Sequence, residues 1–308
     1  MRFVVVLALL AAVGSLVCSA AQAQSGSSGS STSTGFCDRS KPTTASEQDR
    51  LFRFAVAIRN ELDASGADTA IISRSGLNLA RFHIRYSHAA VLTRSESNVW
   101  TARQLYYACD EARPRLFDQG LAGFTAGVDD PDLGYISLVV MPAQPGHMLR
   151  VASQDKSLAL ALLASTYSAD AYAFSTRYQN CNQWVIEMIG LAWGNLPGGD
   201  DVRDRAQDWL KQAHYDPSPV DVGSGLLMIA SAFTPMLHLN DHPKADRESM
   251  RLKVSLPLAI ETFVKEQWAT SQRIELCHTR TQIVIHHGWS PITEGCVPGA
   301  GDRVLALD

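Results

Sequence analysis

The chain has 308 residues, a formal net charge of -4 at pH 7 and 46% hydrophobic residues. This length suffices for one large domain, or for a domain with an appendage. The weakly acidic balance and the absence of basic clusters in the sequence argue against nucleic acid as a partner.

The N-terminus has the pattern of a secretory signal peptide over residues 1–23. Arg2 precedes an apolar run over residues 3–13, and Ala21 to Ala23 form an Ala-x-Ala cleavage site. The run is too short to span a membrane, and no later segment is long and apolar enough. Residues 24–36, rich in Ser, Gly and Thr, predict a flexible leader. We therefore expect a periplasmic or secreted protein without a transmembrane segment.

Cysteine usage fits an oxidising compartment. Removal of the signal peptide leaves Cys37, Cys109, Cys181, Cys277 and Cys296. An odd number in an exported protein leaves room for two disulfides and one free thiol. The arithmetic permits pairing of Cys277 with Cys296 across a hairpin, and of Cys37 with Cys109. Cys181 is then the odd one out, because its neighbours are polar and open a helix.

Hydrophobic periodicity predicts mixed helices and strands in the first half of the mature chain. We expect helices at 46–62 and 157–165, and strands at 69–73, 87–93, 99–107, 134–141 and 148–151. Residues 110–127 are expected to form a loop and a helix. If the polar turn over 94–98 closes a hairpin with Thr93 opposite Val99, then His88 lies opposite Gln104.

The second half is predicted to contain three helices and a terminal strand pair. The helices are expected at 181–194, 203–213 and 257–268, and the strands at 273–277 and 281–286. Residues 225–233 are apolar but ambiguous, and residues 238–251 have the composition of a loop. Together the elements predict an α+β fold with an antiparallel sheet packed on helices. A core over 37–200 is followed by a helical and β-hairpin extension over 201–308, packed on that core.

Cys181 is the first candidate for chemistry. It opens a helix, where unpaired backbone N–H groups and the macrodipole favour an anion and lower the pKa of a thiol. The alternative is a small core residue or half of a disulfide.

A nucleophilic thiol needs a base and a group that orients the base. His88 and Gln104 provide these residue types, and chain order carries no weight in such a triad. Asn180, Asn182 and Tyr86 are candidate donors to an oxyanion. The alternative for the two asparagines is that they cap the helix.

A metal site is the rival interpretation. His238 and His242 have the i, i+4 spacing of a helical metal pair, with Asp241 and Asp246 nearby. Asn240, Asp241 and Pro243 oppose a helix there, so a solvated loop is the better interpretation, and we expect no metal and no cofactor. A metal-dependent enzyme stays in reserve.

Two motifs carry a family resemblance. Residues 86–91 (YSHAAV) in an early strand and 178–184 (YQNCNQW) at a later helix start resemble the circularly permuted branch of the NlpC-like papain fold, over 69–194. With residues 203–210 and 257–264 added, nearly all the mature chain resembles an exported bacterial family of unknown function.

The resemblance implies a circularly permuted papain-like fold and thiol acyl chemistry. Cys181 would be the nucleophile, His88 the general base and Gln104 the orienting group, acting on an amide or ester bond. A small molecule, a peptide or a lipid is the expected substrate. Related enzymes often use a carboxylate or a second His in the third place, and Gln stabilises an imidazolium less. The alternative is a non-catalytic periplasmic binding or assembly protein that retains the cleft. The sequence does not fix the oligomeric state.

Overall fold

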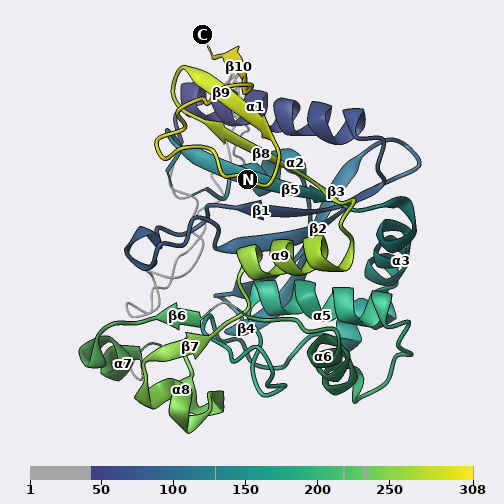
Figure 1. Cartoon of the computed structure of the whole chain (residues 1–308), viewed down its shortest axis with the longest axis vertical. Helices are drawn as coiled ribbons and strands as arrows, with labels where there is room; N and C mark the ends of the chain where they lie inside the picture. The colour runs from purple at the N-terminus through teal and green to yellow at the C-terminus, as the bar shows by residue number, and fades with distance from the viewer. Residues whose placement is uncertain (1–42, 129, 218, 232–233, 235, 308) are drawn as a thin grey trace, which may run out of the picture.

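The computed structural model describes residues 43–128, 130–217, 219–231, 234 and 236–307 (Figure 1). The predicted signal peptide, the leader and Cys37 lie outside the described residues. Within this range, no helix combines the length and the apolar character needed to cross a membrane.

An eight-stranded antiparallel sheet forms the centre of the protein (Figure 1). Its strand order is β10-β9-β8-β5-β1-β2-β3-β4. The strands are β1 (Thr69–Arg74), β2 (His88–Arg94), β3 (Trp100–Ala108), β4 (Arg113–Gly120), β5 (Gly134–Val140), β8 (Gln272–His278), β9 (Gln282–His287) and β10 (Arg303–Ala306). Residues 272–306 therefore extend the same sheet as residues 69–140.

Helices cover the sheet on both faces. On one face lie α1 (Ala45–Ala64) and α2 (Leu121–Thr125), and on the other lie α3 (Ala143–Gln154), α5 (Cys181–Trp193) and α9 (Pro257–Gln267). The strands alternate between two cores: Ala89 and Val91 pack with α5, whereas Ala90 and Leu92 pack with α1. This is the two-residue period of a sheet buried on both faces.

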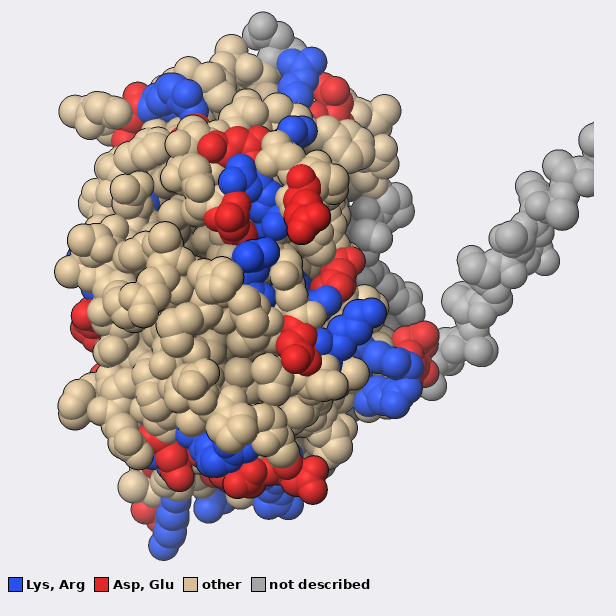
Figure 2. Space-filling model, turned by 90° about the vertical axis from the view of Figure 1, so that its right-hand side faces the viewer, with Lys and Arg blue, Asp and Glu red and all other residues tan. Residues whose placement is uncertain are grey.

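Smaller elements complete the fold. They are α4 (Lys156–Ala161), α6 (Val202–Gln212), α7 (Gly225–Ser231), α8 (Lys244–Glu248), β6 (Pro219–Asp221), β7 (Arg251–Lys253) and the 3-10 helices η1 (Ala80–Phe82) and η2 (Leu239–Asp241). β6 and β7 form a separate two-stranded sheet. On the side of the molecule seen in Figure 2, acidic and basic side chains lie next to one another.

The α+β class and the antiparallel sheet packed on helices are confirmed. Two local predictions are wrong. Residues 148–151 belong to helix α3 and not to a strand. Within 110–127, residues 113–120 form strand β4 in place of the expected loop, and the expected helix follows as α2. The ambiguous segment 225–233 forms α7 as far as Ser231, and the expected loop over 238–251 contains η2 and α8.

The hairpin register also differs from the prediction. Thr93 pairs with Thr101 and not with Val99, a shift of two residues. Because side chains alternate with a period of two, the shift leaves His88 and Gln104 on the same face as predicted.

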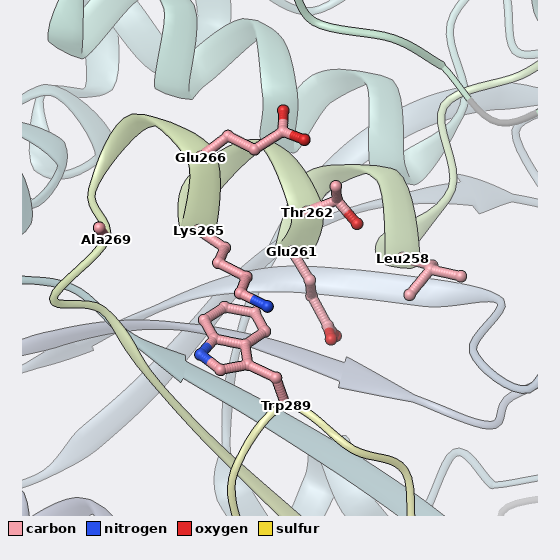
Figure 3. Close-up of a pocket in the computed structure, with 7 residues that line it drawn as sticks. All are labelled: Leu258, Glu261, Thr262, Lys265, Glu266, Ala269 and Trp289. Atoms are coloured by element: carbon pink, nitrogen blue, oxygen red, sulfur yellow. The ribbon is translucent and has the colours of Figure 1, made fainter.

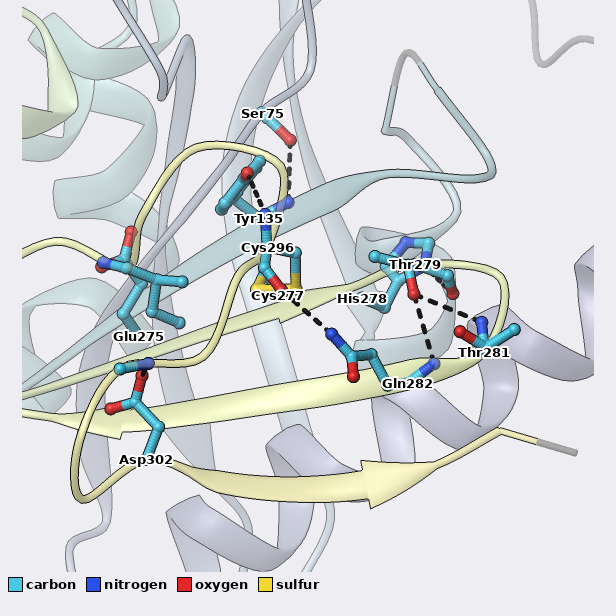
Figure 4. The surroundings of a disulfide bond; sticks show 12 residues. Ser75, Tyr135, Glu275, Cys277, His278, Thr279, Thr281, Gln282, Cys296 and Asp302 are labelled. Atoms are coloured by element: carbon cyan, nitrogen blue, oxygen red, sulfur yellow. Dashed lines mark hydrogen bonds between the residues drawn. A yellow bond between two sulfur atoms is a disulfide. The ribbon is translucent and has the colours of Figure 1, made fainter.

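One predicted disulfide is confirmed. Cys277 and Cys296 are bonded, and their Cα atoms are 5.7 Å apart (Figure 4). Cys109 is also disulfide-bonded, while its predicted partner, Cys37, is outside the described residues. Cys181 is a free, buried thiol, as the odd cysteine count predicts.

Candidate active site

The start of α5 is fixed by an asparagine cap. Asn180 Oδ1 accepts a hydrogen bond of 2.7 Å from the backbone N–H of Gln183, and its Nδ2 donates to the Ala169 carbonyl at 3.3 Å. Both polar atoms of the Asn180 side chain are thus engaged in hydrogen bonds, and Asn180 caps the helix as the alternative interpretation predicts. Cys181 follows as the first residue of the helix, with 8% of its surface exposed.

A buried ion pair holds the segment that leads into α5. Glu187 is fully buried and accepts four hydrogen bonds, from Arg203 Nε (2.8 Å) and Nη2 (2.9 Å), Gln179 Nε2 (2.6 Å) and Gln207 Nε2 (2.7 Å). Arg203 also donates to the carbonyls of Thr176 (2.6 Å) and Tyr178 (3.0 Å). The guanidinium therefore ties α6, α5 and the preceding loop together and fixes where Cys181 lies.

The Cys181 thiol lies against the backbone on both sides of His88. Its S–H group donates to the Ser87 carbonyl with an Sγ–O distance of 3.9 Å, and Asn182 Nδ2 donates to the same carbonyl at 3.1 Å. The Ala89 N–H also approaches Sγ and lowers the pKa of the thiol. The β2–β3 ladder ends at Val91 and Arg103, whereas β2 stays paired with β1 as far as His88, so the tip of α5 meets β2 just beyond the part of the strand that pairs with β3.

Burial dominates the protonation of this thiol. Desolvation raises the pKa of Cys181 to about 12, against the N–H groups of Asn182, Cys181 and Ala89 and the charge of Arg74, which lower it. The helix start thus acts on the thiol in the predicted direction but is outweighed. At neutral pH the group is a thiol and not a thiolate.

His88 is held by the predicted glutamine. His88 Nε2 and Gln104 Oε1 are 2.7 Å apart, and Gln104 Nε2 donates to Gln119 Oε1 at 2.6 Å. Because the amide oxygen faces the ring, Nε2 carries the proton and Nδ1 keeps its lone pair. The ring also stacks on Tyr106, with centroids 4.7 Å apart, and lies 5.9 Å from the Phe124 ring.

The imidazole is neutral in this environment. Burial is the largest cause, and together with the charge of Arg74 it lowers the pKa of His88 to about 3, against the bond to Gln104. Arg74 is the cross-strand partner of His88 and donates to the Phe124 carbonyl and the Tyr106 hydroxyl. Sequence analysis missed Arg74 and Tyr106, because only the pairing of β2 with β1 and β3 brings them to the ring.

The Cys181 thiol contacts the backbone next to His88, but the thiol and the imidazole are not hydrogen-bonded to each other. The S–H donates to Ser87, and the imidazole bonds to Gln104. The His88 ring packs with Phe124 on the α2 side of the sheet, whereas Cys181 packs in the core under α5. Because the two side chains lie on opposite faces of β2, rotation of the side chains alone does not join them, and a reaction between them requires the backbone at the start of β2 to move.

The structure separates the remaining candidate donors. The Tyr86 hydroxyl donates to Glu275, away from Cys181. Asn182 lies next to the thiol, but its Nδ2 is bonded to Ser87, and its Oδ1 has no hydrogen-bond partner among the described residues.

The histidines of the rival metal site are used in packing. His238 stacks on Tyr178 with centroids 4.6 Å apart, and His242 Nε2 lies 2.6 Å from the Asp170 carbonyl oxygen. Between them the chain forms the short 3-10 helix η2, so the i, i+4 geometry of an α-helix is lacking. In the described part of the chain, no three His, Cys, Asp or Glu side chains are grouped to hold a metal ion.

Comparison with known families identifies the family of this chain. A family model described as "Uncharacterized protein conserved in bacteria (DUF2145)" matches residues 61–264. The chain belongs to this family. The match includes His88, Gln104 and Cys181 as well as the Glu187–Arg203 pair, and it ends within α9, before the disulfide of Cys277 and Cys296. No curated protein and no solved structure matches the chain.

Proposed function

We propose that this protein is an exported thiol hydrolase or acyltransferase of the permuted papain-like type, acting on an amide or ester bond. The observation that carries the proposal is the contact of the free Cys181 thiol with the backbone on both sides of His88. The bond from His88 to Gln104 adds the third member of a Cys–His–polar arrangement. The predicted signal peptide and the disulfides support the exported location.

The reaction uses the lone pair of His88 Nδ1. As Sγ attacks the carbonyl carbon, Nδ1 accepts the thiol proton, and the charge on the carbonyl oxygen is stabilised by backbone N–H groups at the start of α5. The proton then passes to the leaving amine or alcohol as its bond breaks, which leaves a thioester on Cys181. Water, or another acyl acceptor, attacks the thioester while His88 removes the acceptor's proton, and the thiol is regenerated.

The resting state is a neutral pair. The pKa of Cys181 is raised to about 12 and that of His88 is lowered to about 3, so neither side chain is charged at neutral pH. Burial and the positive charge of Arg74 disfavour an imidazolium, and the hydrogen bond to the neutral Gln104 does not offset them. The proton transfer therefore accompanies the attack instead of preceding it, after substrate binding has brought the ring and the thiol together.

Acylation by an activated ester tests this function. Intact-mass spectrometry should detect one acetyl group on Cys181 after brief incubation with p-nitrophenyl acetate, and Cys181→Ala should abolish it. His88→Ala should slow acetylation by about 100-fold or more, the size of a lost general base. His147→Ala, an exposed histidine on α3, is the matched control and should react normally. Equal acetylation of the His88→Ala and parent proteins would contradict the proposal.

The second candidate is a non-catalytic binding or assembly protein, favoured by the burial of the thiol at 8% exposure. Alkylation by iodoacetamide as a function of pH shows whether Cys181 and His88 rest as a neutral pair or as a thiolate–imidazolium pair. With a pKa of about 12, roughly one Cys181 in 10⁵ is a thiolate at pH 7, so the rate should rise about tenfold per pH unit from pH 7 to pH 10. A plateau near pH 6 would instead reveal a preformed thiolate–imidazolium pair. Labelling only after unfolding, with no acetylation, would select the binding protein.

A further inference from the structure

Three side chains near the end of the chain form a Ser–His–Asp series of hydrogen bonds. His286 lies on β9, Ser290 on the loop that follows, and Asp302 directly before β10. His286 Nε2 and Ser290 Oγ are 2.8 Å apart, and His286 Nδ1 lies 2.7 Å from Asp302 Oδ1. All three residues lie outside the segment that the family model matches, and none takes part in the Cys181 chemistry described above.

The carboxylate of Asp302 fixes the tautomer of the imidazole. Asp302 Oδ2 accepts from the Gly299 N–H at 2.7 Å, while Oδ1 faces the ring. Because an ionised carboxylate only accepts, Nδ1 of the neutral His286 ring carries the proton, and Nε2 presents its lone pair to Ser290. The hydroxyl of Ser290 therefore donates to Nε2. This is the arrangement in which a histidine activates a serine nucleophile.

Exposure to solvent rises from the acid to the nucleophile. The Asp302 side chain is 4% exposed and that of His286 is 22% exposed, whereas Ser290 is an exposed residue. The base and its orienting acid are thus shielded, while the hydroxyl is open to a substrate. In the described part of the chain, the backbone N–H groups of Trp289 and Ser290 donate to no other residue, so both can donate to an oxyanion.

The loop that carries Ser290 is held against the sheet. The Gly288 N–H donates to the Arg273 carbonyl at 2.9 Å, and Arg273 Nη1 donates to the Ser290 carbonyl at 3.4 Å. A Cβ atom at Gly288 would lie 3.1 Å from His286 Nε2, and φ there is +145°, so glycine lets the backbone turn close to the ring. These contacts fix the hydroxyl and the imidazole relative to each other before a substrate binds.

A hollow of about 470 Å³ lies between this loop and α9 (Figure 3). Trp289, the residue before the nucleophile, lines it from the loop, and the exposed Leu258 lines it from the helix. Lys265 Nζ lies 4.9 Å from the centre of the Trp289 ring and supports the indole. Glu261 and Glu266 also line the hollow and disfavour a second carboxylate there. The hollow therefore suits a short, uncharged, apolar chain.

We propose that Ser290, His286 and Asp302 form a second hydrolytic site, which cleaves small carboxylic esters with an apolar acyl chain. Ser290 Oγ attacks the carbonyl carbon while its proton passes to His286 Nε2. The leaving alcohol takes that proton as the C–O bond breaks, and the acyl group stays on Ser290 with its chain against Trp289. Water then attacks the acyl-serine and gives a proton to Nε2. The carboxylic acid leaves, and Nε2 returns the proton to Ser290 Oγ.

Labelling with diisopropyl fluorophosphate tests the site, because an activated serine displaces fluoride from this reagent. The full-length Cys181→Ala protein is the parent throughout, so the outcome does not depend on the thiol chemistry. Peptide mass spectrometry should locate a diisopropylphosphoryl group on Ser290. His286→Ala and Asp302→Asn should each slow this labelling by about 100-fold or more, since one loses the base and the other its tautomer. A folded parent protein without the adduct on Ser290 would overturn the proposal.

Further variants separate catalysis from a structural role of these hydrogen bonds. His287→Ala is the matched control, because this neighbouring histidine also pairs with a carboxylate, that of Glu61 at 2.9 Å, but on the opposite face of β9. Its labelling should equal that of the parent. Ser290→Ala should lower kcat/KM for p-nitrophenyl butyrate at least about 100-fold, and thermal unfolding confirms that each variant is folded. Parent-like hydrolysis by Ser290→Ala, or equal slowing of labelling in His287→Ala and His286→Ala, would contradict the assignment.

Discussion

Two buried Arg–Glu pairs lie on the same side of the sheet, and their surroundings differ. Glu187 pairs with Arg203 and accepts four hydrogen bonds, so both of its oxygens are fully used. Glu261 pairs with Arg273 through one oxygen, and the hydroxyls of Ser73 and Ser137 lie close enough to lower the pKa of Glu261. The first pair completes a framework around the start of α5, whereas the second connects α9 to β8.

The environment of each arginine reinforces this difference. Arg203 binds one carboxylate and two loop carbonyls, so no second acid compensates for the loss of Glu187. Arg273 also donates to Glu275 Oε2 at 3.1 Å, and Glu275 accepts from Arg85 and from the Ile292 N–H. The second pair is thus one member of a larger network and tolerates the loss of one charge better.

Arg203→Met should have the largest effect on stability. Removing the guanidinium leaves the fully buried Glu187 charge without its cation, which costs about 3–5 kcal/mol of the free energy of unfolding. Arg59→Met breaks an exposed i, i+4 pair with Asp63 and should cost less than about 1 kcal/mol. Urea denaturation of both variants measures the difference. Similar costs in the two would mean that the Glu187 network is not a scaffold.

Loss of the disulfide should have an intermediate effect on stability. We expect the effect in the network that contains Glu261, Arg273 and Glu275. Cys277 and Cys296 close a loop of 19 residues that presents the Ile292 N–H to Glu275 and the Cys296 N–H to Tyr135 (Figure 4). Cys277→Ser combined with Cys296→Ser should lower the free energy of unfolding by about 2–4 kcal/mol. Hydrogen exchange at Ile292 should accelerate, while exchange in α5 should not. Faster exchange in α5 would show that the two networks are coupled.

Glu261→Gln should have the smallest effect on the free energy of unfolding at neutral pH, about 1 kcal/mol, because Arg273 keeps Glu275 as a carboxylate partner. Burial raises the pKa of Glu261 above 4.5, so its ionised form costs stability at neutral pH, and this cost is lost as the pH falls through the raised pKa. Acidification from pH 7 to pH 5 should therefore stabilise the parent relative to Glu261→Gln in urea titrations.

Glu187→Gln is the comparison variant for this measurement. Because Arg203 then has no carboxylate partner, the substitution should cost several-fold more at pH 7 than Glu261→Gln, on the order of 3 kcal/mol. Equal costs for the two glutamine variants would remove the distinction between the Glu187–Arg203 pair and the Glu261–Arg273 pair.

Local pattern predicted the elements whose periodicity is strong. The helix over 46–62 and the strand over 134–141 match α1 and β5 to within two residues at each end, because one face or the whole segment is apolar. The strand β4 was missed because its Pro114 and charged residues favour a loop, yet an edge strand tolerates both. The segment 148–151 alternates like a strand, but Leu149 and Ala152 are buried on one face of α3.

The sequence by itself determined the odd cysteine, the capped helix that follows Asn180 and the proximity of His88 to Gln104. The odd cysteine follows from the cysteine count, and the helix cap from contacts within a few residues. The proximity of His88 to Gln104 follows from a hairpin in which a register shift of two residues keeps side chains on the same face. Only the tertiary structure decided that the thiol donates to Ser87, that the imidazole stacks on Tyr106 and that burial keeps both neutral. Long-range pairing and desolvation arise when distant segments close around a site, and neither is encoded in the spacing of the residues that form it.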